Sequence, residues 1–208
     1  MMRAALALAL CAMAFADSPR IVYTKEFPGS TPPWVSIAVE RSGDVVYKEA
    51  ANDELPARFK LRDDEAQEIF RLTDKLDRFS RPLESNLKVA RMGIKTFRFE
   101  DGATKHEVKF NYSLDEDAKA LADWFERITE SEQYLLRLEV SVKYEKLGVN
   151  DALLRLQAAW ERKRLVGAEQ FLPLLDRVIK NDSYLHMARE RAAALADSIR
   201  TQKPAKAE

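Results

Sequence analysis

Hydrophobic and polar residues alternate along much of the first half of the chain, which is the pattern of β-strands with one buried face. Segments 35–40 and 45–48 alternate on either side of a glycine-containing turn, and so do segments 94–100 and 105–112. Two alternating segments around such a turn predict a β-hairpin. With a further strand expected from residue 21, the pattern predicts five strands in two hairpin units.

Between and after the hairpins, the apolar spacing changes to three and four residues, which predicts α-helices. The first helix should begin at 62–65 and end near Phe79, because Pro82 cannot continue it. A long helix is expected from Ser113, as its N-cap, to Lys146. Three shorter helices are predicted at about 151–165, 169–180 and 183–200.

This order of elements predicts an α+β fold. We expect a small antiparallel sheet of two hairpin units with helices on one face, followed by a C-terminal α-helical segment. The predicted organisation is a signal peptide at 1–16, an α+β domain at 17–147, a helical segment at 148–200 and a disordered tail at 201–208.

The first sixteen residues have the pattern of a secretory signal peptide. Arg3 gives a positive start, an apolar run continues to Met13, and 14–16 read Ala-x-Ala before Asp17. The run is too short to cross a bilayer as a helix, so no transmembrane segment is expected after cleavage. We therefore predict export, to the periplasm or out of the cell.

Charge and cysteine content narrow the possible functions. Cys11, the only cysteine, lies inside the predicted signal peptide, so the mature chain would have no disulfide, cysteine nucleophile or cysteine metal ligand. Cleavage would also remove Arg3 and leave one more acidic than basic residue. A near-neutral chain lacks the basic footprint of nucleic-acid binding, and no nucleic-acid partner is predicted.

The segment "FPGSTPPWVSIAVERSGDVVYKE", with "KTFRFEDGATKHEVKFNY" and "LADWFERITESEQYL" after it, resembles a bacterial family of exported domains of unknown function. The family's first hairpin has the form C-F-G-x-C-P-x-Y…G-x-V-x-Y. The resemblance covers roughly residues 20–135 and implies export and a fold, but no activity. Both loop cysteines are missing here and one residue is inserted near Pro32, so no role of those cysteines carries over.

Little in the sequence indicates catalysis, and no catalytic residue, metal site or cofactor is predicted. His106 and His186 are far apart in the chain, with no second ligand at metal-binding spacing. The acidic triplets at 63–65 and 115–117 stand at expected helix starts, where they stabilise the N-terminus. No nucleophile elbow or phosphate-binding loop is present.

Two loops are the candidate binding segments. The connector at 80–92 is long for a compact domain, which favours a functional role. The loop before Trp34 contains Pro28, Pro32 and Pro33, and its prolines are expected to mark a sheet edge or the entry to a strand. The candidate binding residues are Trp34, Arg81, Glu84, Lys88 and Arg91.

The sequence therefore predicts an exported, non-catalytic envelope or secreted protein that binds an unknown protein partner as an interaction or scaffold module. The alternative is a hydrolase-type enzyme that uses carboxylates and His106. A pocket that holds His106 with two carboxylates would favour the enzyme, and an exposed apolar patch would favour the binding module.

Overall fold

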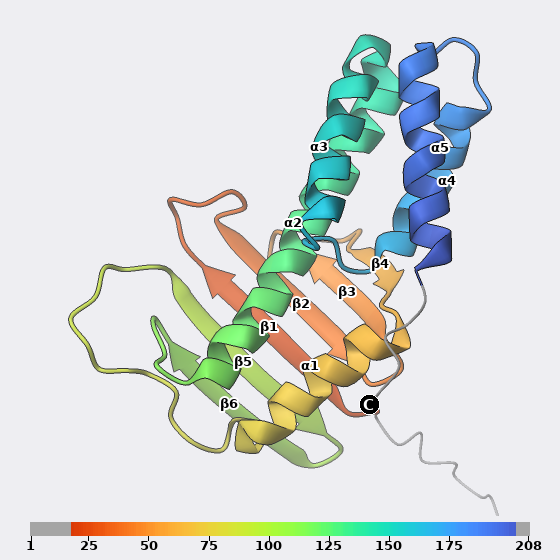
Figure 1. The fold of residues 1–208 in the computed structure, drawn as a ribbon. Helices are drawn as coiled ribbons and strands as arrows, with labels where there is room; N and C mark the ends of the chain where they lie inside the picture. Colours follow the sequence, from red (N-terminus) through yellow and green to blue (C-terminus); the bar gives the residue numbers. More distant parts are fainter. Residues whose placement is uncertain (1–17, 203–208) are drawn as a thin grey trace, which may run out of the picture.

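The computed structural model of the protein describes residues 18–202 (Figure 1). The predicted signal peptide and most of the predicted tail lie outside these residues. The fold is α+β, as the sequence predicts: α1 and α2 cross one face of a sheet, and a helical unit extends from the C-terminal half of α2 (Figure 1). None of the helices in residues 18–202 has the length and apolar character that crossing a membrane requires.

The sheet has six antiparallel strands in the order β4-β3-β2-β1-β5-β6. They are β1 (Arg20–Glu26), β2 (Trp34–Glu40), β3 (Asp44–Lys48), β4 (Ala57–Lys60), β5 (Ile94–Asp101) and β6 (Thr104–Phe110). The first strand is central, because β1 pairs with both β2 and β5 and so joins the two hairpins. β4 is additional to the five predicted strands. It has only four residues and directly follows Pro56, so its alternation is too short to stand out.

Two α-helices cover the sheet and three form most of the helical unit. They are α1 (Asp63–Lys75), α2 (Glu116–Tyr144), α3 (Val149–Glu161), α4 (Leu172–Ile179) and α5 (His186–Thr201), with 3-10 turns η1 (Asp77–Phe79), η2 (Lys146–Gly148) and η3 (Ala168–Phe171). The prediction of Ser113 as the N-cap of the long helix is wrong. Asp115 is the N-cap, and its carboxylate accepts hydrogen bonds from two backbone N–H groups of the first turn.

The first hydrophobic core lies between the sheet and the two helices that cross it. Tyr23 of β1 and Phe97 of β5 are fully buried at its centre, and the Tyr23 ring stacks on Phe125 of α2 at 4.7 Å between centroids. Burial of each large aromatic side chain contributes roughly 2–3 kcal/mol. The opposite face of the sheet carries the polar side chains of the alternating pattern and is covered by no described helix.

The second core lies within the helical unit and is formed by α3, α4, α5 and the C-terminal half of α2. Phe125 and Ile128 of α2 belong to the first core, whereas Leu138 and Val142 belong to the second. One continuous helix therefore contributes buried side chains to both cores.

The loop after α3 returns to the sheet unit and fastens the two parts together. Val166 packs in the first core, and its N–H donates to Ser131 Oγ on α2 at 2.9 Å. The next N–H, that of Gly167, donates to the buried carboxylate of Glu65 at 3.1 Å. Arg164 forms ion pairs with Asp123 and Glu130 on α2. Backbone hydrogen bonds and charge pairs thus hold this junction.

Candidate functional site

The proline loop and the long connector meet at one end of the sheet. The proline loop joins β1 to β2, and its Phe27 N–H donates to Pro33 O at 2.8 Å. Gly93, at the end of the connector, has a φ of +89°, and a Cβ at this position would lie 2.7 Å from Phe27 Cβ. Only glycine permits this close approach with a left-handed backbone. The two segments that the sequence singles out are therefore in contact.

Trp34 lies at the start of β2, on the sheet face that α1 and α2 leave open. Its register partner on β1 is Glu26, and Glu26 is also opposite Ile94 of β5. Paired residues of adjacent strands share a face, so these three side chains form a row across the end of the sheet. Pro33 directly precedes this strand and so marks a strand entry, although β2 is central rather than an edge.

Glu84 holds the connector in place. Its carboxylate accepts hydrogen bonds from the N–H groups of Asn111 at 2.6 Å and Ser85 at 2.9 Å. The Asn111 bond is the main reason that the pKa of Glu84 lies below its usual value. The Asn111 side chain in turn accepts from Met92 N–H and donates to Ala90 O. The role of Glu84 in the structure is to position the loop.

The three basic candidates differ in their surroundings. Arg81 forms ion pairs with Asp115 at 2.6 Å and Asp77 at 3.2 Å, so it ties the start of the connector to the N-cap of α2. These partners raise its pKa. Lys88 and Arg91 are exposed and form no ion pair with any residue in 18–202. Of these three, only Lys88 and Arg91 have charges available to a ligand.

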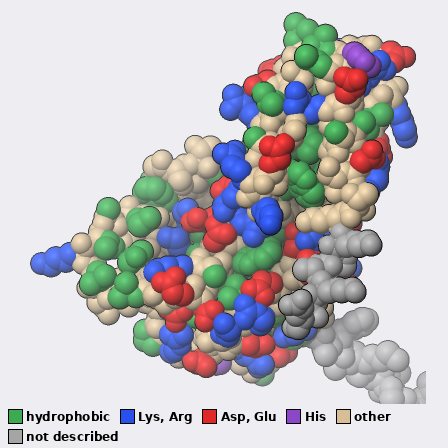
Figure 2. Space-filling model, in the orientation of Figure 1, with side chains coloured by type: hydrophobic (Ala, Val, Ile, Leu, Met, Phe, Trp, Pro, Cys, Tyr) green, Lys and Arg blue, Asp and Glu red, His purple; other side chains and the backbone are tan. Residues whose placement is uncertain are grey.

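Apolar side chains are exposed between these charges. Leu87, Val89, Met92 and Ile94 have exposed fractions of 52%, 39%, 51% and 46%. We call these four residues the connector patch. Figure 2 shows hydrophobic side chains gathered over this loop, with positive charge at its tip. Contiguous exposed apolar residues of this kind mark interaction sites more often than scattered ones do.

The sequence prediction named the charged residues of the connector and missed its apolar ones. A weak signal was present, since Leu87 and Val89 alternate and Met92 and Ile94 do so again. Single apolar residues in a loop carry no information about exposure until the backbone is placed. The backbone here is fixed mainly by Glu84, Asn111 and Gly93.

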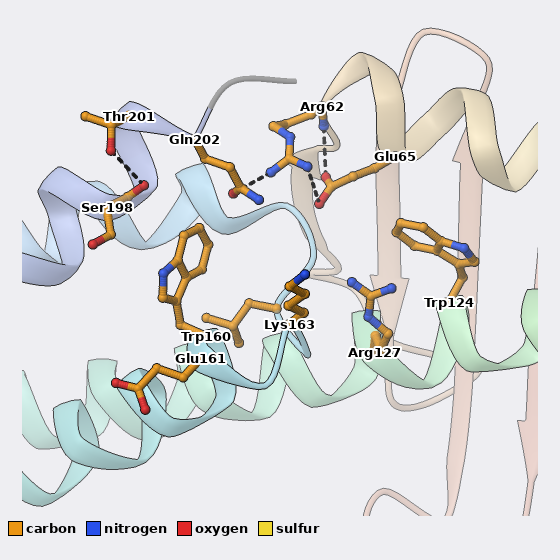
Figure 3. A pocket seen from close by; sticks show the side chains of 11 residues that line it. Arg62, Glu65, Trp124, Arg127, Trp160, Glu161, Lys163, Ser198, Thr201 and Gln202 are labelled. Carbon is orange, nitrogen blue, oxygen red and sulfur yellow. Dashed lines mark hydrogen bonds and ion pairs between the residues drawn. The ribbon is translucent and has the colours of Figure 1, made fainter. Parts of the chain in front are cut away.

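A cavity of about 580 Å³ lies at the junction of the two cores. Figure 3 shows Trp124 and Trp160 on opposite sides, with Arg127 and Lys163 between them. The Arg127 guanidinium lies 4.3 Å from the centre of the Trp124 ring, and burial lowers its pKa.

The buried carboxylate that lines this cavity, Glu65, already has hydrogen-bond donors within the protein. The Glu65 carboxylate accepts hydrogen bonds from the N–H groups of Arg62 and Gly167, and burial raises its pKa despite these contacts. Gln202, the last described residue, accepts from Arg62 at 2.6 Å and lines the cavity. Glu65 therefore acts as a structural link between α1 and the loop after α3.

Neither histidine lies within a group of several carboxylates among the described residues. His106 Nδ1 lies 3.2 Å from the Arg78 carbonyl oxygen, and no described carboxylate bonds to this ring. His186 is exposed at the start of α5 and pairs with Glu190 at 3.2 Å. Among residues 18–202, no group of three or more histidine, cysteine and acidic side chains is arranged to hold a metal ion.

A comparison with protein-family models gives no match for this chain, and a comparison with curated proteins gives none either. The resemblance to a family of exported domains therefore stays a prediction. The function has to be argued from the geometry of the described surface.

Proposed function

We propose that this chain is an exported, non-catalytic module that binds a partner protein of the cell envelope through the connector patch. The observation that carries the proposal is the combination of apolar exposure and a fixed backbone. Three apolar side chains are 39–52% exposed on a loop that is anchored by hydrogen bonds to Glu84 and Asn111, and Ile94 at the start of β5 continues them.

A fixed loop favours binding because less conformational entropy is lost when the partner docks. Lys88 and Arg91 lie beside the patch without ion-pair partners among residues 18–202. An apolar centre with a charged rim is the usual anatomy of a protein interface. The partner surface that fits is therefore apolar at its centre and acidic at its rim.

Trp34 and the row that it forms with Glu26 and Ile94 extend the patch onto the open face of the sheet. Tryptophan is among the residues that most often dominate binding energy at interfaces. The alternative hydrolase function has no comparable support, because no described carboxylate contacts His106.

Site-specific photo-crosslinking in the producing cell tests the proposal. A photoreactive amino acid at Met92 should give one discrete protein adduct, and the additional change Leu87→Asp should abolish it. Met187 on α5 is the matched control, because its exposed fraction is 54% against 51% for Met92. Equal adducts at both positions, or none at Met92, would refute the proposed interface.

Export is a separate part of the proposal and rests on the sequence of residues 1–16. Intact mass measurement of the protein from the producing cell should give a chain that begins at Asp17. A chain that keeps its first residues and stays in the cytoplasm would contradict export without affecting the interface.

A further inference from the structure

The cavity at the junction of the two cores, which we call the junction cavity, has the size of a small-molecule site. Its volume of about 580 Å³ lies within the roughly 300–1,000 Å³ that such sites occupy. It is lined by the start of α1, by α2, by the end of α3 with the loop after it, and by the end of α5. No residue of the connector patch lines it. The ligand that fits it is indicated by the lining groups that have no partner within the chain.

Arg127 of α2 is a lining residue with an unpaired charge. It is partly buried, it forms no ion pair with any residue in 18–202, and its buried Nε makes no hydrogen bond to them either. The acids one helical turn away, Asp123 and Glu130, both pair with Arg164 at 2.7 Å instead. A partly buried cation without an acceptor is costly, so its presence favours an anion that the described chain does not supply.

The contact of Arg127 with Trp124 leaves the hydrogen-bond donors of the arginine free. The guanidinium carbon lies 4.3 Å from the centre of the Trp124 ring, so the two groups are stacked. Stacking uses the flat face of a guanidinium, whereas its N–H groups lie in the plane and point outward from the edge. Figure 3 shows the terminal nitrogens of Arg127 in the cavity beside Lys163, joined to no other residue that is drawn. Such an edge can hold one carboxylate with two parallel hydrogen bonds.

The charges around the junction cavity favour a ligand with a single negative charge. Arg62 and Glu65 pair with each other at 3.7 Å. Lys163 is exposed and, like Arg127, forms no ion pair with any described residue. Glu161 also lines the cavity, but Figure 3 shows its carboxylate on the opposite side from Arg127. An anion between Arg127 and Lys163 would therefore meet two cations and no free carboxylate.

The lining favours an aromatic ring over a sugar for the rest of the ligand. Trp160 faces Trp124 across the cavity, and no described cation lies over the Trp160 ring (Figure 3). The hydroxyl groups of Ser198 and Thr201 donate to backbone carbonyl oxygens one turn earlier in α5, at 2.9 and 2.8 Å. Their protons are therefore already used. A sugar needs partners for several hydroxyl groups, whereas an aromatic ring needs only a flat apolar surface.

We propose that the junction cavity binds a small aromatic monocarboxylate, with its carboxylate on Arg127 and Lys163 and its ring against Trp160. Arg127 lies on the helix that both cores share, and Trp160 lies on α3 of the helical unit. The ligand would therefore join the two parts of the molecule. Because only the folded chain forms this cavity, binding should also raise the stability of the chain.

The test uses the whole chain and 3-phenylpropionate, with binding followed by NMR through the indole N–H signals of the three tryptophans. The probe should shift the signals of Trp124 and Trp160, because its ring lies between them. It should leave the signal of Trp34 unchanged, because Trp34 does not line the cavity. No shift of the Trp160 signal at millimolar probe would refute the site.

Substitutions test the two cations. Arg127→Met keeps most of the side-chain length and removes the donors, so it should weaken binding about tenfold or more. Lys163→Met changes an exposed residue on which folding does not depend, and it should weaken binding several-fold. Arg155→Met is the matched control and should have no effect, because Arg155 is exposed on α3 and pairs with Asp151 at 2.9 Å. Unchanged binding by both Arg127→Met and Lys163→Met would overturn the proposal.

Three further compounds test the class of ligand. Equal binding of the neutral 3-phenylpropanamide would contradict the role of the carboxylate, and equal binding of propionate would contradict the role of the ring. Tighter binding of glucuronate than of 3-phenylpropionate would show that the occupant is an acidic sugar, which also contradicts the proposal. Met92→Asp in the connector patch should leave binding of 3-phenylpropionate unchanged. This variant separates a failure of the junction cavity from a failure of the proposed interface.

Discussion

The buried carboxyl of Glu132 should make the stability of the whole chain depend on pH. Its pKa is raised from 4.5 to about 7, mainly by burial. Each factor of ten in an ionisation constant is about 1.4 kcal/mol, so the difference corresponds to about 3 kcal/mol. Between these two pH values, the folded state holds a proton that the unfolded state has released. The free energy of unfolding must therefore fall as pH rises.

Glu132→Gln removes this proton uptake. The neutral amide resembles the protonated carboxyl, so the variant and the natural chain should be about equally stable near pH 4. As pH rises, the free energy of unfolding of the variant should exceed that of the natural chain by a growing amount, which reaches about 3 kcal/mol at pH 8. Urea denaturation followed by circular dichroism at intervals across this range measures the difference.

The exposed Glu145 provides the control, since Glu145→Gln should follow the natural chain at every pH. If the difference in free energy of unfolding between the natural chain and Glu132→Gln stays constant within about 0.5 kcal/mol across this pH range, Glu132 does not hold a proton in the folded state.

Three further substitutions test the packing, each measured by urea denaturation. Gly93→Ala should cost about 2–3 kcal/mol, since its Cβ would lie 2.7 Å from the neighbouring loop, and Gly102→Ala, with open space around it, should cost about 1 kcal/mol. Glu65→Ala strips two backbone N–H groups of their acceptor and should cost about 2–4 kcal/mol, against about 0.5 kcal/mol for Glu68→Ala, whose partly exposed side chain pairs only with Arg71. Arg164→Met removes two ion pairs at a site where the arginine side chain is 29% exposed, so it should cost only about 1 kcal/mol and should speed amide exchange in its own loop.

The alternating pattern was sufficient to predict the hairpins and the face that they bury. Val35, Ile37 and Val39 all point into the first core, as period-two alternation requires. The central place of β1 could not be predicted, because its pairing with β5 joins residues far apart in the sequence, from Glu26 with Ile94 to Arg20 with Glu100. Such pairing depends on the whole sheet and leaves no local signal.

The candidate site was predictable only in outline. The length of the connector indicated a functional loop, but the sequence could not show that Glu84 would be used to hold it or that Leu87 and Met92 would be left exposed. Glu132 gave no signal at all, since a glutamate within a charged helix is ordinary. Its burial results from Tyr47 and Gln170, which approach from distant parts of the chain.

The shared helix α2 also determines where the chain can change length. One residue inserted between Ile128 and Leu138 would turn everything after it by about 100° and advance it by about 1.5 Å. Leu138 and Val142 would then leave the second core, or Phe125 and Ile128 would leave the first. Loops usually accept insertions. In this stretch of α2 an insertion would change the rotation between the side chains that enter the first core and those that enter the second. Natural variation in length should therefore collect in the turns, and sequence drift along α2 should proceed by substitution alone.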